Sequence, residues 1–261
     1  MVRFKAHTAR RVAGEVVDLG RAQGLGAAAR RVWDLARATV RWYNPFRATE
    51  RNEQCEFDRV HGVDTSGHLN PGRLRVSSPN VVYSQYYKGI DPEHFHAMMD
   101  AAGVRFAEYS FVDFGSGKGR ALMMASEYPF RDVTGVEFAE DLHAIAVENL
   151  KRYRGEPACK RVRSTLGDAT EFDLPPAPLV LYFYDPFDGE VLERVIANIE
   201  RSLNENPRDC VILYAHPRFR ELFDRQPWLA PTLHADYWIR YQANLDQLRP
   251  DAAAAALAAG R

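Results

Sequence analysis

From about residue 105, short continuous apolar runs alternate along the chain with longer segments in which apolar residues recur at helical spacing. The apolar runs predict strands at 109–114, 132–138, 160–169, 178–187 and 209–217, followed by a closing hairpin within 232–245. The segments between them predict helices at 118–128, 139–153 and 191–203. Because strands and helices alternate, we expect an α/β fold with a doubly wound, mostly parallel sheet and right-handed crossovers.

The N-terminal part of the chain has a different pattern. Residues 8–43 contain two helical patterns, whereas residues 44–90 are irregular and rich in turn formers and aromatic residues. A helix is predicted to begin sharply, with Asp91 as N-cap and Pro92 at its first position, and to stop at Gly103. The predicted parts are an N-terminal helical and loop cap (1–90), a main domain (91–250) and an Ala-rich tail (251–261) that is a frayed helix or disordered.

The composition excludes several classes of protein. Hydrophobic residues make up 46% of the chain, which is ordinary for a soluble globular protein, and no run approaches the ~18 apolar residues of a transmembrane helix. The first residues lack the apolar core and cleavage site of a secretory signal. The three cysteines are far apart and lack metal-ligand spacing, so we expect reduced thiols, no metal site and a cytoplasmic protein.

The net charge of −1 conceals a basic N-terminal region. Residues 1–51 carry eleven arginines and lysines against four acids, a local charge of +7. Such a region could bind an anionic partner such as a membrane surface or a nucleic acid. The alternative is a solvated helical face, because arginine outnumbers lysine 29 to 5 over the whole chain, a bias typical of a GC-rich genome.

The first predicted strand of the main domain is followed by the glycine-rich stretch "DFGSGKGR". A phosphate-binding loop requires Ser or Thr after its lysine, but Lys118 is followed by Gly119. A dinucleotide fingerprint requires a small residue where this chain has Arg120. Both of these cofactor classes are therefore disfavoured, and a turn without a ligand remains the simplest alternative.

The pattern Asp113-x-Gly115-x-Gly117-x-Gly119 resembles motif I of the class I, Rossmann-like methyltransferases that use S-adenosylmethionine. The resemblance covers about residues 105–245 and implies a seven-stranded, mostly parallel sheet with S-adenosyl-L-methionine as cofactor. In that family, an acid after the second strand binds the ribose hydroxyls and an acid after the third strand lies near the adenine. The matching cofactor-binding residues in this chain are the motif I positions with Ser116, and downstream Glu137, Phe138, Asp168 and Ala169. Each acid could instead be a surface or cap residue.

The end of the fourth predicted strand supplies the candidate acceptor site. The stretch Tyr184-Asp185-Pro186-Phe187 partly resembles the [DN]-P-P-[YF] tetrad of amino-group methyltransferases, although it has one proline and its aromatic residue comes early. The resemblance implies that Asp185 and Tyr184 are catalytic and that Pro186 and Phe187 bind the substrate. The alternative is a turn that caps the next helix through Asp185 or Asp188.

Two further residues complete the candidate set. His216, at the end of the fifth strand, could be the general base for a hydroxyl acceptor, or a hydrogen-bonded turn histidine. The layout of a helical N-terminal region before "GSGKGR" also resembles, more weakly, the SET-independent histone and protein-lysine methyltransferases. The loop "YSQYYKG" could then close over the cofactor, with Tyr86 as a substrate-binding residue, or simply pack the cap on the core.

We therefore expect an S-adenosylmethionine-dependent methyltransferase acting on a nitrogen nucleophile, either a protein lysine or a small-molecule amine. An O-methyltransferase of a small molecule or glycan, which uses His216, is the first alternative. A non-catalytic, cofactor-binding interaction subunit is the second. The sequence leaves the identity of the methyl acceptor open.

Overall fold

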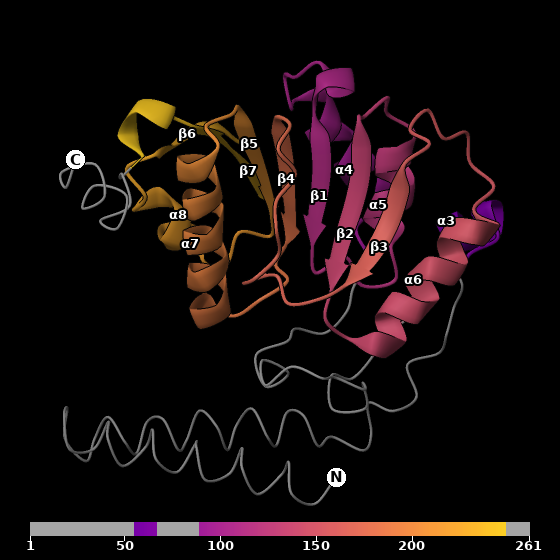
Figure 1. Ribbon diagram of the computed structural model, residues 1–261. Coiled ribbons are helices and arrows are strands. Elements are labelled where there is room, and N and C mark those ends of the chain that lie inside the picture. Colours follow the sequence, from indigo (N-terminus) through magenta and orange to yellow (C-terminus); the bar gives the residue numbers. More distant parts are fainter. Residues whose placement is uncertain (1–54, 67–88, 249–261) are drawn as a thin grey trace, which may run out of the picture. The chain divides into compact units, whose positions relative to one another are not determined.

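Seven strands form one central sheet in the computed structural model, which describes residues 55–66 and 89–248 (Figure 1). Their order is β3-β2-β1-β4-β5-β7-β6; β1 to β5 run parallel, and β7 lies antiparallel between β5 and β6. The strands are β1 Ser110–Phe114, β2 Asp132–Glu137, β3 Val162–Leu166, β4 Leu179–Tyr184, β5 Cys210–Ala215, β6 Leu229–His234 and β7 Trp238–Ala243. This confirms the predicted doubly wound, mostly parallel sheet of class I methyltransferase type, including its closing hairpin.

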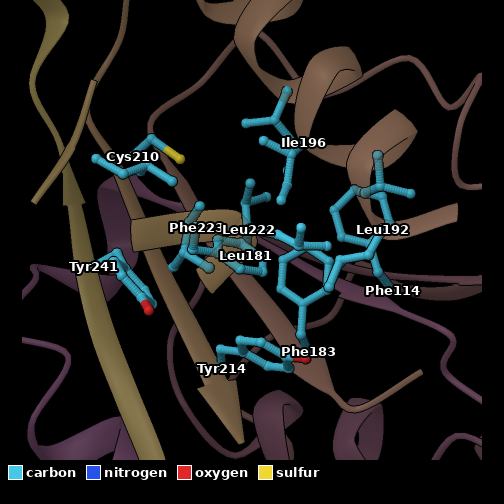
Figure 2. Packing of buried hydrophobic residues seen from close by; sticks show 14 of the residues in the cluster. Phe114, Leu181, Phe183, Leu192, Ile196, Cys210, Tyr214, Leu222, Phe223 and Tyr241 are labelled. Atoms are coloured by element: carbon cyan, nitrogen blue, oxygen red, sulfur yellow. The ribbon is translucent and has the colours of Figure 1, made fainter. Parts of the chain in front are cut away.

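The middle strands are buried on both faces, which explains their nearly continuous apolar sequences. Phe111, Val180 and Val211 face the helices α4 (Pro92–Asp100) and α5 (Arg120–Ser126). Phe114, Leu181 and Phe183 face α7 (Gly189–Glu205) on the other side. Figure 1 shows α7 in front of the sheet and α4 and α5 behind it. Figure 2 shows the α7 side, where the rings of Phe114 and Phe183 stack with centroids 5.0 Å apart. Helices thus cover both faces and leave the strand ends for a site.

The helices begin and end near their predicted limits. Asp91 caps α4, and its carboxylate accepts a hydrogen bond from the Glu93 backbone N–H at 3.0 Å; Gly103 adopts φ +67° beyond the helix end. Asp188 caps α7, accepting from the Val191 N–H at 3.1 Å. The main helices are α4 Pro92–Asp100, α5 Arg120–Ser126, α6 Glu140–Arg152 and α7 Gly189–Glu205. Local capping and apolar spacing therefore suffice to define them.

Two short helices were not predicted. The helix α3 (Glu56–His61) lies within residues 44–90, which were expected to be irregular, and it packs Phe57 into the core. The helix α8 (Arg220–Asp224) follows β5 and packs Phe223 into the core. Each has six residues or fewer, too short to show helical periodicity. Their formation depends on contacts with distant parts of the chain.

Several predictions lie outside the described residues. They concern the helices within 8–43, the basic segment 1–51, the loop "YSQYYKG" with Tyr86, and the Ala-rich tail. Contacts divide the chain into two units, Met1–Arg51 and Asn52–Arg261. The domain limits at 90 and 250 stay predictions. Of the helices that the structure describes, none is long and apolar enough to cross a membrane.

Candidate functional site

The carboxyl ends of β1, β2, β4 and β5 meet at one edge of the sheet. In the strand order, β1 has β2 on one side and β4 on the other, so connections leave this point in opposite directions. Ligands of open parallel sheets bind outside the strand ends at such a reversal. The glycine loop follows β1, and the sequences around Asp185 and His216 follow β4 and β5. The fold therefore brings two predicted halves of the site to one edge of the sheet: the cofactor half, which contains the glycine loop, and the acceptor half, which contains Asp185 and His216.

Three glycines give the loop after β1 a conformation that L side chains rarely adopt. Gly115, Gly117 and Gly119 have φ +79°, +54° and +84°. A Cβ on Gly115 would also lie 2.4 Å from the Pro186 Cβ. The first glycine is therefore required by backbone geometry and by close contact with Pro186, which joins the cofactor half of the site to the acceptor half.

Glu137, at the end of β2, holds the glycine loop in place. One carboxylate oxygen accepts a hydrogen bond from the Gly117 N–H at 2.8 Å, and the other accepts from the Ala139 N–H at 2.9 Å. Burial raises the pKa of Glu137 to about 7, although these backbone donors oppose the shift. Because each carboxylate oxygen has two acceptor positions, the side chain can still accept hydrogen bonds from two ligand hydroxyls.

Asp113 is also buried, with 3% of its surface exposed. Burial, together with the negative charge of Glu137, raises its pKa well above the ordinary value. Within the described ranges no hydrogen bond to the Asp113 carboxylate is found, and the nearby Ser116 Oγ is buried without a partner. The beginning of the loop thus has polar groups whose hydrogen-bonding capacity is unused.

The third predicted acid follows β3. Asp168 Oδ1 accepts hydrogen bonds from the backbone N–H and the hydroxyl of Thr170, at 2.9 and 2.8 Å. This local turn fixes the carboxylate and places Ala169, which is 5% exposed, against the core on the α7 side. Phe138 lies partly buried between Glu137 and the start of α6. The structure therefore places all the predicted cofactor residues at or just after the carboxyl ends of β1, β2 and β3, and their roles stay predictions.

Sequence reasoning used Lys118 and Arg120 only to exclude other motifs, yet both bind the segment 55–66. Lys118 Nζ lies 2.8 Å from Asp64 Oδ1 and donates to the Ser66 carbonyl oxygen. The Arg120 guanidinium donates to Thr65 Oγ1 at 2.7 Å and to the carbonyl oxygens of Thr65 and Ile90, both at 3.2 Å. The two cations thus attach the segment 55–66 to the glycine loop.

The acceptor half contains two non-glycine residues with positive φ, Asp185 at +43° and His216 at +50°. They follow β4 and β5, where Tyr184 pairs with Ala215, and the rings of Tyr184 and His216 lie with centroids 5.8 Å apart. Such conformations cost roughly 1–3 kcal/mol each and cluster at functional sites. The predicted catalytic residues Tyr184, Asp185 and His216 are therefore neighbours.

An arginine that the sequence analysis did not identify completes this half. Arg218 Nε lies 3.3 Å from Asp185 Oδ1, and its Nη2 donates to the Phe187 carbonyl oxygen, also at 3.3 Å. Burial raises the pKa of Asp185, while the charges of Arg218 and His216 oppose that shift. Because Asp188 and not Asp185 caps α7, the Asp185 carboxylate is available to the site.

Two tyrosines and a histidine at the same edge were not among the predicted site residues. Tyr182 pairs in register with Asp113, and its hydroxyl has no hydrogen-bond partner in the described part of the chain. The ring of Tyr237, which precedes β7, lies 4.1 Å from the ring of His94 at the start of α4. A tyrosine within a strand sequence such as "LVLYFYDPF" carries no signal that distinguishes a packing ring from a ligand-binding one.

These groups fit an adenosyl cofactor. Glu137 retains acceptor capacity for vicinal hydroxyls, Asp113 offers a carboxylate to a cationic group, and Gly115 lets the backbone approach closely. In the part of the chain that the structure describes, no group of three His, Cys, Asp or Glu residues could hold a metal ion.

No family model matches the sequence, and a comparison with curated proteins gives no match. Solved structures with a similar fold include an RNA methyltransferase from Salinibacter ruber in complex with S-adenosyl-L-homocysteine, with 21% identity and a TM-score of 0.41 over 60% of this chain and 92% of that one. A ribosomal protein L11 methylase from Lactobacillus delbrueckii subsp. bulgaricus has 15% identity and a TM-score of 0.41, over 57% and 74%. A precorrin-6y C5,15-methyltransferase from Geobacter metallireducens GS-15 has 14% identity and a TM-score of 0.43, over 66% and 94%. These likenesses are distant, so the case for a function rests on the residues of this chain.

Proposed function

We propose that this protein is an S-adenosylmethionine-dependent methyltransferase that acts on a nitrogen nucleophile, a protein lysine or a small-molecule amine. One observation carries the proposal: the glycine loop held by Glu137 lies directly against Pro186 of the acceptor half. A cofactor bound at the glycine loop is thereby next to a substrate bound beside Pro186.

When bound, the cofactor supplies an electrophilic methyl group on its sulfonium. The chain's contribution is to bind and to orient, because a direct displacement requires alignment more than covalent catalysis. We assign the ribose hydroxyls to Glu137, the cationic amino-acid end to the neighbourhood of Asp113, and the adenine edge to Asp168 and Ala169. The buried positions of Glu137 and Asp113 exclude water from these contacts.

In the acceptor half, Asp185 accepts a hydrogen bond from the acceptor N–H and so directs the nitrogen lone pair. The carboxylate is held by Arg218, and Phe187 is 7% exposed, so the turn is rigid and partly shielded from water. Partial desolvation favours a neutral amine, the form that can attack, because an ordinary alkylamine has a pKa of about 10.4. Tyr184 and Phe187 flank this position.

One observation favours an oxygen acceptor instead. His216 is exposed to solvent and adopts positive φ beside Tyr184. This arrangement suits a general base for a hydroxyl group. A non-catalytic interaction subunit is the remaining alternative, and the basic segment 1–51 would then bind an anionic partner such as a nucleic acid or a membrane surface.

Calorimetry with S-adenosylhomocysteine and with NAD tests the cofactor. We expect binding of S-adenosylhomocysteine and no heat with NAD; the reverse result would overturn the proposal. Incubation of the protein with cell lysate and isotopically labelled S-adenosylmethionine, followed by mass spectrometry, then tests the reaction. Label on lysine or on an amine supports the nitrogen acceptor, label on oxygen supports the His216 alternative, and binding without transfer supports the interaction subunit.

A further inference from the structure

Two tyrosine hydroxyls at the carboxyl edge of the sheet are buried and have no hydrogen-bond partner among the residues that the structure describes. They belong to Tyr182, which is 1% exposed in β4, and to Tyr237, which immediately precedes β7. A buried hydroxyl that leaves its hydrogen bond unmade costs free energy, so such groups are uncommon in folded proteins. Their presence at the candidate site points to a polar group that a ligand supplies.

The surroundings of these hydroxyls are negatively charged. Burial raises the pKa of the Tyr182 hydroxyl, and Asp113, which pairs in register with Tyr182 on the adjacent strand, raises it further; burial and then Asp91 raise the pKa of Tyr237. Tyr184 adds to the rise in the pKa of both hydroxyls. The cation Arg120, whose charge acts on Tyr184, is already bound to the segment 55–66 and ion-paired with Asp58 at 3.8 Å. An excess of negative charge selects a cationic ligand group.

Within the described ranges, Ser116 Oγ and Asp185 Oδ1 of the candidate site are also buried without a hydrogen-bond partner, whereas other such atoms lie elsewhere. Trp228 Nε1 belongs to the hydrophobic cluster on the α7 side, and Thr134 lies in the middle of β2, paired with Val112 and Arg163. Neither adjoins a carboxylate of the candidate site. Tyr182 differs because it pairs with Asp113, and Tyr237 differs because its carbonyl oxygen accepts a hydrogen bond from the His216 N–H of the acceptor half at 2.7 Å.

We propose that the hydroxyls of Tyr182 and Tyr237, together with the Asp113 carboxylate, form a binding site for a protonated amine. An ammonium group has three N–H donors and no acceptor, which matches two hydroxyl oxygens and one carboxylate. The carboxylate supplies the counter-charge that a buried cation requires. This inference rests on the proposed function, in which the amine is either the α-ammonium of the cofactor or the acceptor amine in its protonated form, which must lose a proton before it can attack.

The variants Tyr182→Phe and Tyr237→Phe remove each hydroxyl and keep the ring. The probes are S-adenosylhomocysteine, which carries the ammonium, 5′-methylthioadenosine, which lacks the amino-acid part, and n-butylammonium in the presence of S-adenosylhomocysteine. We expect each variant to bind an ammonium-bearing probe about tenfold more weakly, as for one lost hydrogen bond to a charged group. Binding of 5′-methylthioadenosine should not change. A loss confined to S-adenosylhomocysteine assigns the site to the cofactor, and a loss confined to n-butylammonium assigns it to the acceptor.

Stability separates this role from a structural one. Because the unligated protein gains nothing from an unpaired hydroxyl, both variants should unfold at the wild-type temperature or higher. Tyr241→Phe is the matched control: its hydroxyl donates to Asp224 Oδ1 at 2.8 Å, so its loss should lower stability and leave every probe affinity unchanged. The inference is overturned if both site variants bind all three probes as the wild type does. If the wild type fails to bind S-adenosylhomocysteine, the proposed function fails, whereas a tyrosine-dependent affinity for n-butylammonium would still support the amine site.

Discussion

Arg218 holds the Asp185 turn from two directions: its Nε lies 3.3 Å from Asp185 Oδ1, and its Nη2 donates to the Phe187 carbonyl oxygen. The guanidinium also lies over the Phe219 ring, 4.6 Å from its centroid. Since Asp185 has positive φ, this arginine stabilises a backbone conformation that is costly by itself. The acceptor turn therefore depends on a residue outside the "YDPF" sequence.

Replacement of Arg218 should impair turnover more than cofactor binding. In Arg218→Gln the Asp185 carboxylate loses its partner and its fixed position, and small displacements of a reacting group reduce rates by about ten- to a hundredfold. We expect kcat to fall accordingly while the affinity for S-adenosylhomocysteine stays within about twofold. Steady-state kinetics and calorimetry measure the two effects. Arg225→Gln, which removes an exposed ion pair with Glu193 away from the turn, is the control and should change neither quantity. A normal kcat in Arg218→Gln would show that Arg218 is dispensable for the turn.

Glu137→Ala should weaken cofactor binding without loss of the fold. The substitution removes the acceptors for the Gly117 and Ala139 N–H groups and, under the proposed function, two ribose contacts. Charge-assisted hydrogen bonds contribute about 1.5–3 kcal/mol each before solvent compensation, so the Kd for S-adenosylhomocysteine should rise at least about tenfold. Calorimetry measures the Kd, and circular dichroism controls for folding. An unchanged Kd in a folded variant would place the ribose contact elsewhere.

Cofactor affinity should increase with pH. The pKa of Glu137 in the unligated protein is raised to about 7, whereas its ordinary value is 4.5, so burial favours the protonated form. That preference stabilises the folded state fully below the ordinary pKa and is lost as the pH rises through about 7. Ribose hydroxyls donate to the carboxylate form, so ligand binding releases a proton and the affinity should rise about tenfold between about pH 6 and about pH 8. The raised pKa of Asp113 acts in the same direction.

Calorimetric titrations with S-adenosylhomocysteine across this pH range measure the effect. Glu137→Gln, which cannot ionise, should lose most of the pH dependence, and the slope that remains reports on Asp113. A wild-type affinity that stays constant over the range would show that Glu137 binds the ligand without a change in protonation.

The attachment of the segment 55–66 to the glycine loop predicts a stability effect. Arg120 is 8% exposed, and Arg120→Met would leave the buried Asp58 without its cation and the Ile90 carbonyl without its donor. Removal of one partner from a buried pair costs about 3–5 kcal/mol. Urea unfolding should show a loss of this size. The control is Arg152→Met, whose exposed ion pair with Glu148 contributes under about 1 kcal/mol. Equal stabilities for the two variants would contradict the assignment of Arg120 as an anchor.

The strands and main helices could be predicted because their causes are local. A continuous apolar run such as β4, or a cap such as Asp91 before Pro92, is sufficient to define an element wherever it lies in the fold. The order of the glycine loop and the following acids also placed one half of the site at the reversal point of the sheet.

The remaining features depend on contacts between distant residues. Arg218 acts on Asp185 across 33 positions of sequence, and Arg120 binds Thr65 across 55. In the sequence, Arg120 was informative only as a departure from the dinucleotide fingerprint, yet that departure arises because its side chain anchors another segment. Tyr182 looked like a core residue because its ring is one, and only the missing partner of its hydroxyl reveals the second role.

Substitutions of Asp185 test whether the methyl acceptor is an amine. It follows β4, next to Pro186, and its carboxylate is available because Asp188 caps the following helix. Asp185→Ala should leave the Kd for S-adenosylhomocysteine within about twofold and lower kcat, because its contacts belong to the acceptor and the transition state. Asp185→Asn should retain more activity if orientation of the N–H is the main role, and little if the negative charge is required. Asp188→Ala is the matched control: it removes a helix cap, at a cost of about 1 kcal/mol, and should lower stability more than kcat. If Asp185→Ala turns over at the wild-type rate, this carboxylate does not bind the acceptor, and His216 with an oxygen acceptor becomes the better explanation of the site.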